Sequence, residues 1–338
     1  MNTAGFRGLS FFRRFASALL ALALLVTLLP PAAAAEIAVT PVEASGPPPF
    51  INWPAQDSEG YLAMEWLEDE FVHIDEEAGR WVYLSHDLRI LIERFHAVHQ
   101  KRKLVYFIAD IRFRGDQAFR AFLADPKNPA RVLERPAVIA RKNKVVYAQN
   151  GDLFSYRYYN KKKMGLIIRG GKVISKDTYT RALAAIPPLD ELALYPNGHV
   201  EMSTPGINSP QDYLNRGATD VLAFGPILFQ HGRKDDRLDK SFTHREPRSA
   251  LGVIKPGHFV GIMVEGRNER SVGANLQFVA DRLIERGCVE AFTLDGGQTA
   301  AMVFMGQEIM DPGIYSGFQQ ARRQQDIIGI GISPKVTK

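Results

Sequence analysis

Residues 291–299 read Ala-Phe-Thr-Leu-Asp-Gly-Gly-Gln-Thr, a short apolar run that ends in a carboxylate and two glycines. Glycine lets the backbone turn sharply and approach a ligand closely, and successive N–H groups in such a turn can bind an anion. Taken alone, the pattern also fits an ordinary Asp-Gly hairpin turn. Similar apolar runs between turn residues recur along the chain and predict a strand-rich fold.

Elsewhere in the chain the sequence predicts three hairpins and several further strands. The hairpins pair Phe71–Ile74 with Trp81–Leu84, Leu166–Ile168 with Lys172–Ile174, and Ala193–Tyr195 with Val200–Met202. Further strands are expected at Leu104–Ile108, Val145–Tyr147, Val221–Phe229, Ala250–Ile254, Phe259–Val264, Ala291–Leu294, Ala301–Met305 and Ile327–Ile332.

Three helices are expected, at Leu88–Gln100, Asp116–Leu123 and Ala274–Arg286. The last has the clearest pattern, because its apolar residues share one face and Gly287 ends it. The layout lacks regular βαβ alternation, which argues against a Rossmann or barrel enzyme. We expect an α+β fold with a strand-rich mixed sheet core and a few packing helices.

The N-terminus has the features of a secretory signal peptide. Arg7, Arg13 and Arg14 precede the apolar run Phe15–Leu29, and Ala32–Ala35 supply a cleavage site. The run is about 15 residues long, shorter than the roughly 20 that span a membrane, although an uncleaved anchor is the alternative. We therefore predict a signal peptide at 1–35, a secreted or cell-envelope protein, and no membrane span after cleavage. Residues 36–54 form a Pro-rich leader, and 55–140 an N-terminal flanking part of the fold.

Composition excludes several classes of function. The chain of 338 residues has a net charge of +5, and removing the three signal arginines leaves +2, so no nucleic-acid partner is predicted. A P-loop and a Gly-x-Gly-x-x-Gly helix start are both missing. Cys288 is the one cysteine and fits a buried small residue, while His96 and His99 lack an obvious third ligand. No cofactor or metal is predicted, although carboxylates such as Asp295 or Asp152 suit calcium.

Three other clusters place polar residues beside glycines at predicted strand ends. They are Arg248-Ser249-Ala250-Leu251-Gly252, Val264-Glu265-Gly266-Arg267 and Gln149-Asn150-Gly151-Asp152. Each alone fits a turn or a surface ion pair. Together with residues 291–299 they repeat one arrangement, which predicts a site on the rim of a sheet.

The order of these clusters resembles the phosphodiester glycosidases, over about residues 150–332. That family's usual motifs are Asn-Gly-Gly-Phe-Phe, Gly-Pro with an apolar pair, Arg-Thr-Ala-x-Gly, Asp-Gly-Arg, a helix with Gly-x-x-Leu-x-x-x-Ala, and Leu-Asp-Gly-Gly-Gly-Ser. The matching places here read Asn150-Gly151-Asp152-Leu153-Phe154, Gly225-Pro226-Ile227-Leu228, Arg248-Ser249-Ala250-Leu251-Gly252, Glu265-Gly266-Arg267, Gly273-Ala274-Asn275-Leu276 through Ala280, and Leu294-Asp295-Gly296-Gly297-Gln298-Thr299. The departures are Asp152, Glu265 and Gln298, whose longer side chains are expected to narrow or reshape the pocket.

The resemblance implies that residues 141–338 form a phosphodiester-glycosidase-like catalytic domain. It implies a hydrolase of sugar-phosphodiester or related envelope and exopolysaccharide glycan linkages, with such a glycan as its partner. The implied site consists of catalytic Asp295 and Glu265, phosphate-binding Arg248, Arg267, Gly296 and Gly297, and substrate-binding Asn150, Asp152, Ser249 and Thr299. One of the two carboxylates would be the base or nucleophile and the other an orienting group. The alternatives are a catalytically silent glycan- or cell-wall-binding protein and an accessory factor in exopolysaccharide assembly.

Overall fold

The computed structural model describes residues 53–177, 189–240, 242–311 and 321–337. The predicted signal peptide and nearly all of the predicted Pro-rich leader lie outside these residues. No helix among the described residues has the length and apolar character needed to cross a membrane.

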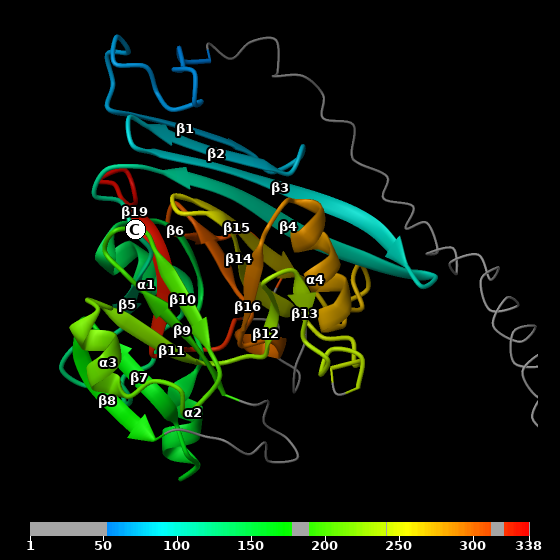
Figure 1. Cartoon of the computed structure of the whole chain (residues 1–338). Coiled ribbons are helices and arrows are strands. Elements are labelled where there is room, and N and C mark those ends of the chain that lie inside the picture. Colours follow the sequence, from blue (N-terminus) through cyan, green and yellow to red (C-terminus); the bar gives the residue numbers. More distant parts are fainter. Residues whose placement is uncertain (1–52, 178–188, 241, 312–320, 338) are drawn as a thin grey trace, which may run out of the picture. The chain divides into compact units, whose positions relative to one another are not determined.

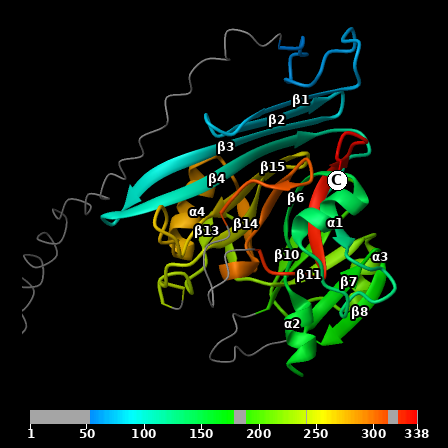
Figure 2. The same cartoon turned by 180° about the vertical axis from the view of Figure 1, so that it is seen from behind.

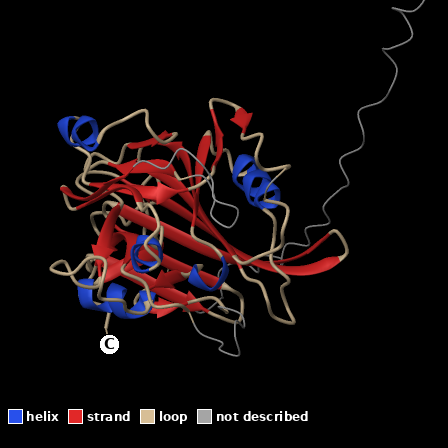
Figure 3. Cartoon of the chain, turned by 90° about the horizontal axis from the view of Figure 1, so that it is seen from below, coloured by secondary structure: helices blue, strands red, loops and turns tan. Residues whose placement is uncertain are grey.

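The described chain is built mainly from strands, with short helices between them (Figure 3). The strands are β1 (Glu70–Asp75), β2 (Arg80–Ser85), β3 (Leu88–His99), β4 (Arg102–Phe113), β5 (Arg120–Leu123), β6 (Val145–Asn150), β7 (Gly165–Arg169), β8 (Lys172–Asp177), β9 (Asp190–Leu194), β10 (Val200–Ser203), β11 (Asp220–Phe224), β12 (Ile227–Gln230), β13 (Arg233–Lys234), β14 (Arg248–Lys255), β15 (His258–Val264), β16 (Glu290–Leu294), β17 (Met302–Phe304), β18 (Gln307–Glu308) and β19 (Asp326–Ile332). The helices are α1 (Pro136–Asn143), α2 (Phe154–Tyr159), α3 (Pro210–Asn215) and α4 (Leu276–Glu285), with a 3₁₀ turn η1 (Gly297–Thr299).

The strands form three sheets in the described part of the chain. A nine-stranded sheet has the order β1-β2-β3-β4-β15-β14-β16-β12-β13, and the hairpin β3–β4 is its longest feature (Figure 1). One five-stranded sheet has the order β18-β17-β6-β19-β5, and α1 lies beside β19 (Figure 2). The other has the order β10-β9-β11-β7-β8. The strand pairs are antiparallel, so the α+β, strand-rich class is confirmed but the expected mixture of strand directions is wrong.

The central strands of the nine-stranded sheet are buried on both faces. In β4, Val105 and Phe107 pack into one core cluster, while Leu104 and Tyr106 pack into another. The first cluster also contains buried residues of β6, β17 and β19, which therefore cover one face of the large sheet. The second contains the apolar side of α4, which covers the other face. Side chains on successive strand positions point to opposite faces, and here each face is covered by protein.

Helix α4 confirms the clearest helical prediction. The side chain of Asn275 accepts a hydrogen bond of 3.0 Å from the Phe278 N–H and caps the first turn. Gly287 follows the helix with a φ of +84°, a conformation that favours glycine. The three predicted hairpins are present as β1–β2, β7–β8 and β9–β10.

The other two helix predictions are wrong. Residues 88–99 form strand β3, in which Ile90 and Ile92 are fully buried while Arg89 and Glu93 face the other side. This is an alternating pattern, and β2 and β4 supply hydrogen-bonding partners along its two edges. Of the segment 116–123, the part at Arg120–Leu123 is strand β5, paired with β19.

Candidate active site at the sheet rim

Three strands of the large sheet end side by side and carry the predicted polar clusters. Arg248 at the start of β14 pairs with Val264 at the end of β15, and the next residue, Ser249, pairs with Leu294 at the end of β16. The residues that follow the two strand ends, Glu265 and Asp295, therefore lie at the same rim as Arg248. Antiparallel register, rather than sequence proximity, assembles this part of the site.

Asn150 binds the backbone at Asp295 from the end of β6, in the five-stranded sheet β18-β17-β6-β19-β5. Its amide nitrogen donates to the carbonyl oxygens of Asp295 at 2.7 Å and of Gly151 at 3.0 Å, and its oxygen accepts the Ala301 N–H at 3.0 Å. The Asp295 N–H in turn donates to the Gly151 carbonyl at 3.2 Å. The end of β6 is thereby tied to the end of β16, and Asn150, which is fully buried, has its side-chain groups engaged with backbone.

The two glycines after Asp295 form a tight turn. Gly297 has a φ of +61°, and its N–H donates to the Pro247 carbonyl at 2.9 Å. A Cβ on Gly296 would lie 2.8 Å from the same carbonyl oxygen, so no larger residue fits there without movement. The turn packs against the start of β14, and the Gly297 N–H is already used inside the protein.

Asp295 is the carboxylate with a perturbed pKa at this rim. It is partly exposed, but the surrounding protein desolvates it and raises its pKa to about 6. The Thr299 hydroxyl, the positive charges of Arg322 and Arg157, and the Gly296 backbone act in the opposite direction by favouring the ionised form. A carboxyl group with such a pKa is poised to exchange a proton near neutral pH.

Arg248 is a desolvated cation beside this carboxyl group. Its Nε donates to the Ala274 carbonyl at 3.0 Å and its Nη2 to the His244 carbonyl at 2.8 Å. Burial lowers its pKa to about 10, so the guanidinium keeps its charge at neutral pH. Its Nη1 lies 3.9 Å from the position of a Cβ on Gly296. Guanidinium groups in such surroundings suit the recognition of phosphate oxygens.

Arg267 lies against the other glycine of the turn. Its Nη2 would be 3.3 Å from a Cβ on Gly297, and its Nε donates to Glu246 at 2.7 Å. Arg248 and Arg267 thus lie near the glycine turn that follows Asp295. Phosphate binding by these arginines and by Gly296 and Gly297 stays a prediction.

Glu265 is fully buried and engaged by two partners. Its carboxylate oxygens accept hydrogen bonds from Arg270, with the Nε–Oε2 distance at 2.7 Å, and from the Asp311 N–H at 2.7 Å. The sequence predicts that one carboxylate is the base or nucleophile and the other an orienting group. The contacts of Glu265 fit the orienting group. A direct catalytic role for Glu265 stays a prediction.

Asp152 points into the interior, away from the rim. It accepts hydrogen bonds from Arg169 at 3.0 Å and from the Ala223 N–H at 3.0 Å. Arg169 also bonds Asp326, whose pKa is raised by burial against the lowering effect of Arg169. The carboxylate of Asp152 therefore joins β6 to β7 and β11.

Ser249 and Thr299 are also fully buried, beneath the rim. The Ser249 hydroxyl accepts from the Gln149 amide at 3.1 Å, and the Thr299 hydroxyl accepts from Arg322 at 3.3 Å. The hydrogen-bond partners described above for Asn150, Asp152, Ser249 and Thr299 are protein groups, so their contact with substrate stays a prediction.

The sequence motifs do not include Arg322 or Arg157, whose charges act on Asp295. Arg157 is buried on α2, where Nη1 donates to the Asp152 carbonyl and Nη2 to the Ala223 carbonyl. The basic pair Arg322-Arg323 just before a predicted strand was the available signal for the first. No comparable pattern marks Arg157. Among the described residues, no group of three or more His, Cys, Asp or Glu side chains is placed to hold a metal ion.

The geometry defines a class of protein: a strand-rich α+β fold with a desolvated carboxyl group and arginines at one sheet rim. The chain belongs to the phosphodiester glycosidase family, whose sequence model matches residues 143–331.

Two solved structures are similar to this chain in fold, and one curated protein is similar to it in sequence. The catalytic domain of zebrafish N-acetylglucosamine-1-phosphodiester alpha-N-acetylglucosaminidase, auto-inhibited by its pro-peptide, has a TM-score of 0.58 at 18% identity over 79% of this chain and 89% of that one. A hypothetical protein from Synechocystis has a TM-score of 0.50 at 14% identity over 74% and 63% of the two chains. The SPbeta prophage-derived uncharacterized protein YomE of Bacillus subtilis (strain 168) is 29% identical over 170 residues, 48% of this chain and 25% of its own length. The chain thus spans about a quarter of that relative.

Proposed function

We propose that this protein is an exported glycoside hydrolase that cleaves the bond between a sugar and a phosphodiester in envelope or extracellular glycans. Membership of the phosphodiester glycosidase family supports the reaction class. The N-terminal sequence pattern supports export. The observation that carries the proposal is that Asp295, with its pKa of about 6, and the desolvated guanidinium of Arg248 lie at the same rim, where each charge acts on the other.

The reaction asks two things of the protein. The phosphate side of the substrate must be held, and the guanidinium groups of Arg248, near Gly296, and Arg267, near Gly297, are the groups that we propose for this task. The bond between the anomeric carbon and the phosphate oxygen then breaks, and the phosphate monoester leaves with the electron pair. Because phosphate is a good leaving group, little acid assistance is needed.

Asp295 acts on the sugar side. Its ionised form takes a proton from a water molecule that attacks the anomeric carbon. In the alternative route Asp295 attacks that carbon itself, and water then hydrolyses the bond between Asp295 and the sugar to release both. Thr299 and Arg322 hold its carboxylate in one orientation, since Arg322 contacts the Thr299 hydroxyl and both favour the ionised form. Glu265 orients Arg270 and the backbone at Asp311.

The test is release of free sugar from a panel of sugar 1-phosphate diesters by the purified protein. We expect Asp295→Asn to lower kcat by about 10²–10⁴-fold, the range for loss of a positioned base. Lys176→Gln, an exposed change on β8, is the control that should leave kcat unchanged. Equal turnover by Asp295→Asn and the unmodified protein would refute the assignment.

A second candidate is a glycan-binding protein without turnover. It is favoured by the ion pair between Glu265 and Arg270, because most glycosidases use two carboxyl groups and this pair engages one of the two predicted here. Binding of a diester without sugar release, at equal affinity in Asp295→Asn, would favour this candidate.

A further inference from the structure

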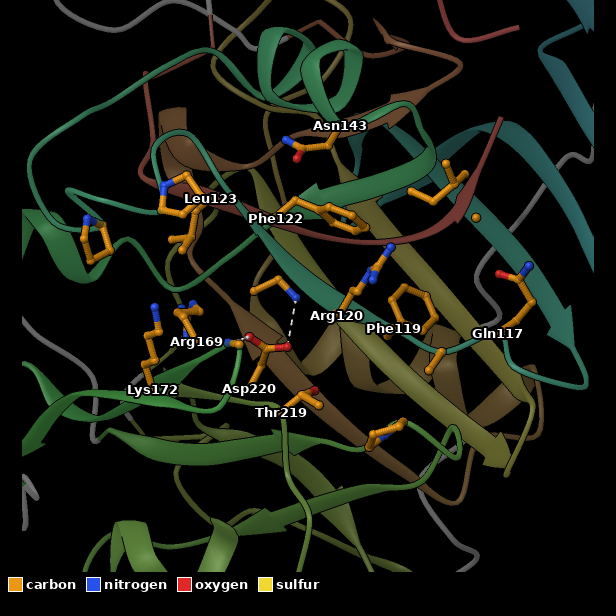
Figure 4. Close-up of a pocket in the computed structure, with 18 of the residues that line it drawn as sticks. Gln117, Phe119, Arg120, Phe122, Leu123, Asn143, Arg169, Lys172, Thr219 and Asp220 are labelled. Atoms are coloured by element: carbon orange, nitrogen blue, oxygen red, sulfur yellow. Dashed lines mark hydrogen bonds between the residues drawn. The ribbon is translucent and has the colours of Figure 1, made fainter. Parts of the chain in front are cut away.

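A pocket of about 970 Å³ lies away from the rim, and it contains none of the ten predicted site residues (Figure 4). One wall is formed by β5 and the segments around it, from Asp116 to Pro129. The other is formed by the β7–β8 hairpin together with Thr219 and Asp220. Ligand pockets in proteins have volumes of roughly 300–1,000 Å³, so this one is large enough for a small ligand or a segment of a polymer.

The two walls are fixed to each other by Asp220, a fully internal carboxylate. One oxygen accepts the Gly170 N–H at 2.9 Å and the other accepts the Ala121 N–H at 3.2 Å. Arg169 completes the floor and is held by Asp152 and Asp326. A site whose walls are joined by buried polar contacts is preorganised, which lowers the entropic cost of binding.

Two exposed cations stand at the pocket, Arg120 on β5 and Lys172 on β8. In Figure 4 they lie on opposite sides of Asp220. Neither forms an ion pair with any residue that the structure describes. The guanidinium carbon of Arg120 lies 4.8 Å from the Phe122 ring centroid, which orients it while leaving its N–H groups for a ligand. Asp116 is the one exposed carboxylate in the lining.

The charge of the surrounding sequence also favours an anionic ligand for this pocket. Residues 153–176 contain seven basic residues and no acidic one. This segment includes the β7–β8 wall, although the chain after the predicted signal has a net charge of only +2. A concave surface with an excess of one sign of charge concentrates ligands of the opposite sign.

We propose that this pocket is a second binding site, which takes an anionic saccharide segment. Its anionic groups would contact Arg120 and Lys172. The pyranose rings would lie against the apolar part of the lining, which includes Phe119, Phe122, Leu123, Pro126, Pro129, Ile174 and Pro196. Gln117, Asn143 and Thr219 supply hydrogen-bonding groups for hydroxyls. A polymer held here raises its own effective concentration at the Asp295 rim.

A saccharide fits better than other polyanions because the pocket is concave and mixes apolar with neutral polar groups. Duplex DNA is recognised by extended basic surfaces that track its phosphates, and an anionic membrane by a basic amphipathic helix or cluster on a flat face. Arg120 and Lys172 instead lie across a hollow.

The experiment is native electrophoresis of the protein in gels that contain phosphomannan or the same mannan freed of phosphate. The electrophoresis is first run with the Asp295→Asn protein, so that the polymer is not cleaved. It is then repeated with the protein that retains Asp295. We expect retardation by phosphomannan alone, and a Kd raised about tenfold by the double change Arg120→Gln and Lys172→Gln. The matched control, Lys163→Gln with Lys176→Gln, removes the same charge from exposed positions of the basic segment outside the pocket and should change Kd less than about twofold.

Several results would overturn the proposal. Equal weakening by the control pair would show diffuse charge attraction only, and equal retardation by neutral mannan would remove the role of the anion. A stronger effect of Arg120→Gln and Lys172→Gln on duplex DNA or anionic vesicles would assign the pocket to another ligand. Loss of retardation on changing Asp295 alone would assign binding to the rim. Because binding is read without turnover, the outcome is independent of whether the protein is a hydrolase.

Discussion

Single residues decide how the rim site can respond to pH. Asp295 lies after an apolar strand, in a turn packed against Pro247 and Arg248, and this surrounding protein accounts for the raised pKa. The sequence shows the carboxylate and the glycines, but it does not show which charges come close to them. Two of these charges belong to Arg157 and Arg322, which are separated from Asp295 in the sequence.

The pKa of Asp295 predicts the acid limb of the pH profile. Asp295 acts in its ionised form, so kcat/KM should rise with pH, reach half of its maximum near pH 6 and level off about one pH unit higher. An aspartate with the ordinary pKa of about 4 would place that limb two pH units lower. The measurement is kcat/KM for sugar release between pH 4 and 8, with a substrate that does not itself titrate in the range. A limb near pH 4 would contradict the prediction.

The buried ion cluster around Arg169 predicts a large effect on stability. Arg169→Met leaves Asp152 and Asp326 buried without their cation, and we expect the free energy of unfolding to fall by about 3–5 kcal/mol at pH 7. The loss should be smaller at pH 5, because the unpaired carboxyl groups can then take up protons. Urea unfolding at the two pH values measures both.

The control for this cluster is Arg233→Ala. That arginine pairs with Asp236 on the surface, where the side chains are 76% and 67% exposed. Exposed pairs contribute little, so the urea midpoint should stay unchanged. An equal loss for Arg169→Met at pH 5 and pH 7 would indicate lost packing rather than unpaired charge.

At the scale of elements, β6 and β15 meet at one unusually close contact between sheets. A Cβ on Gly261 of β15 would collide with the Tyr147 hydroxyl of β6 and lie 2.9 Å from the Gln149 Oε1. The Tyr147 hydroxyl is buried and has no hydrogen-bond partner among the residues described. A glycine is needed here because the two strand backbones carry large side chains toward each other.

This contact predicts a pair of coupled substitutions. Gly261→Ala should destabilise the protein by about 1–3 kcal/mol through overpacking. Tyr147→Phe should be neutral or stabilising, since it removes an unpartnered hydroxyl. The double variant should recover part of the loss, because the phenyl ring lacks the colliding oxygen. Thermal unfolding of the four proteins tests this, and strictly additive effects would contradict it.

The elements also show where sequence patterns succeed. Helix α4 has a 3.6-residue apolar period, an asparagine cap and a glycine stop, all local signals. Strand β3 has an alternating pattern, but its leucine, isoleucine, arginine and glutamate residues also suit a helix, so residue type alone predicts it wrongly. Its pairing with β2 and β4 decides the outcome.

On the scale of the whole molecule, residues 55–140 and 141–338 share one sheet. Strand β4 pairs with β15 along its length, from His258 opposite Arg112 to Val264 opposite Tyr106. Phe107 and Ile111 of β4 lie in the same core cluster as residues of β14, β16 and β19. The segment that carries the predicted catalytic domain is therefore completed by the segment before it.

This shared sheet predicts that residues 141–338 do not fold alone. Removing residues 1–140 exposes an edge of β15 and the apolar residues that β4 covers, so we expect an insoluble product or one without a cooperative thermal transition. The control is the fragment 53–338, which keeps the pairing of β4 with β15 and should show a cooperative thermal transition. A soluble, cooperatively folding fragment 141–338 would refute the prediction.

Local sequence patterns were enough to predict the strand-rich class, the hairpins with local turn signals and helix α4. The glycine-flanked motifs, taken in order, also predicted the family. These are local properties, set by side-chain period and by the backbone freedom of glycine. Other features depend on tertiary contacts. Asp152 and Glu265 lie in internal ion pairs, and Asp295 is desolvated beside Arg248. A basic pocket also forms elsewhere in the fold. Burial and charge proximity arise from strands far apart in the chain, and no local pattern encodes them.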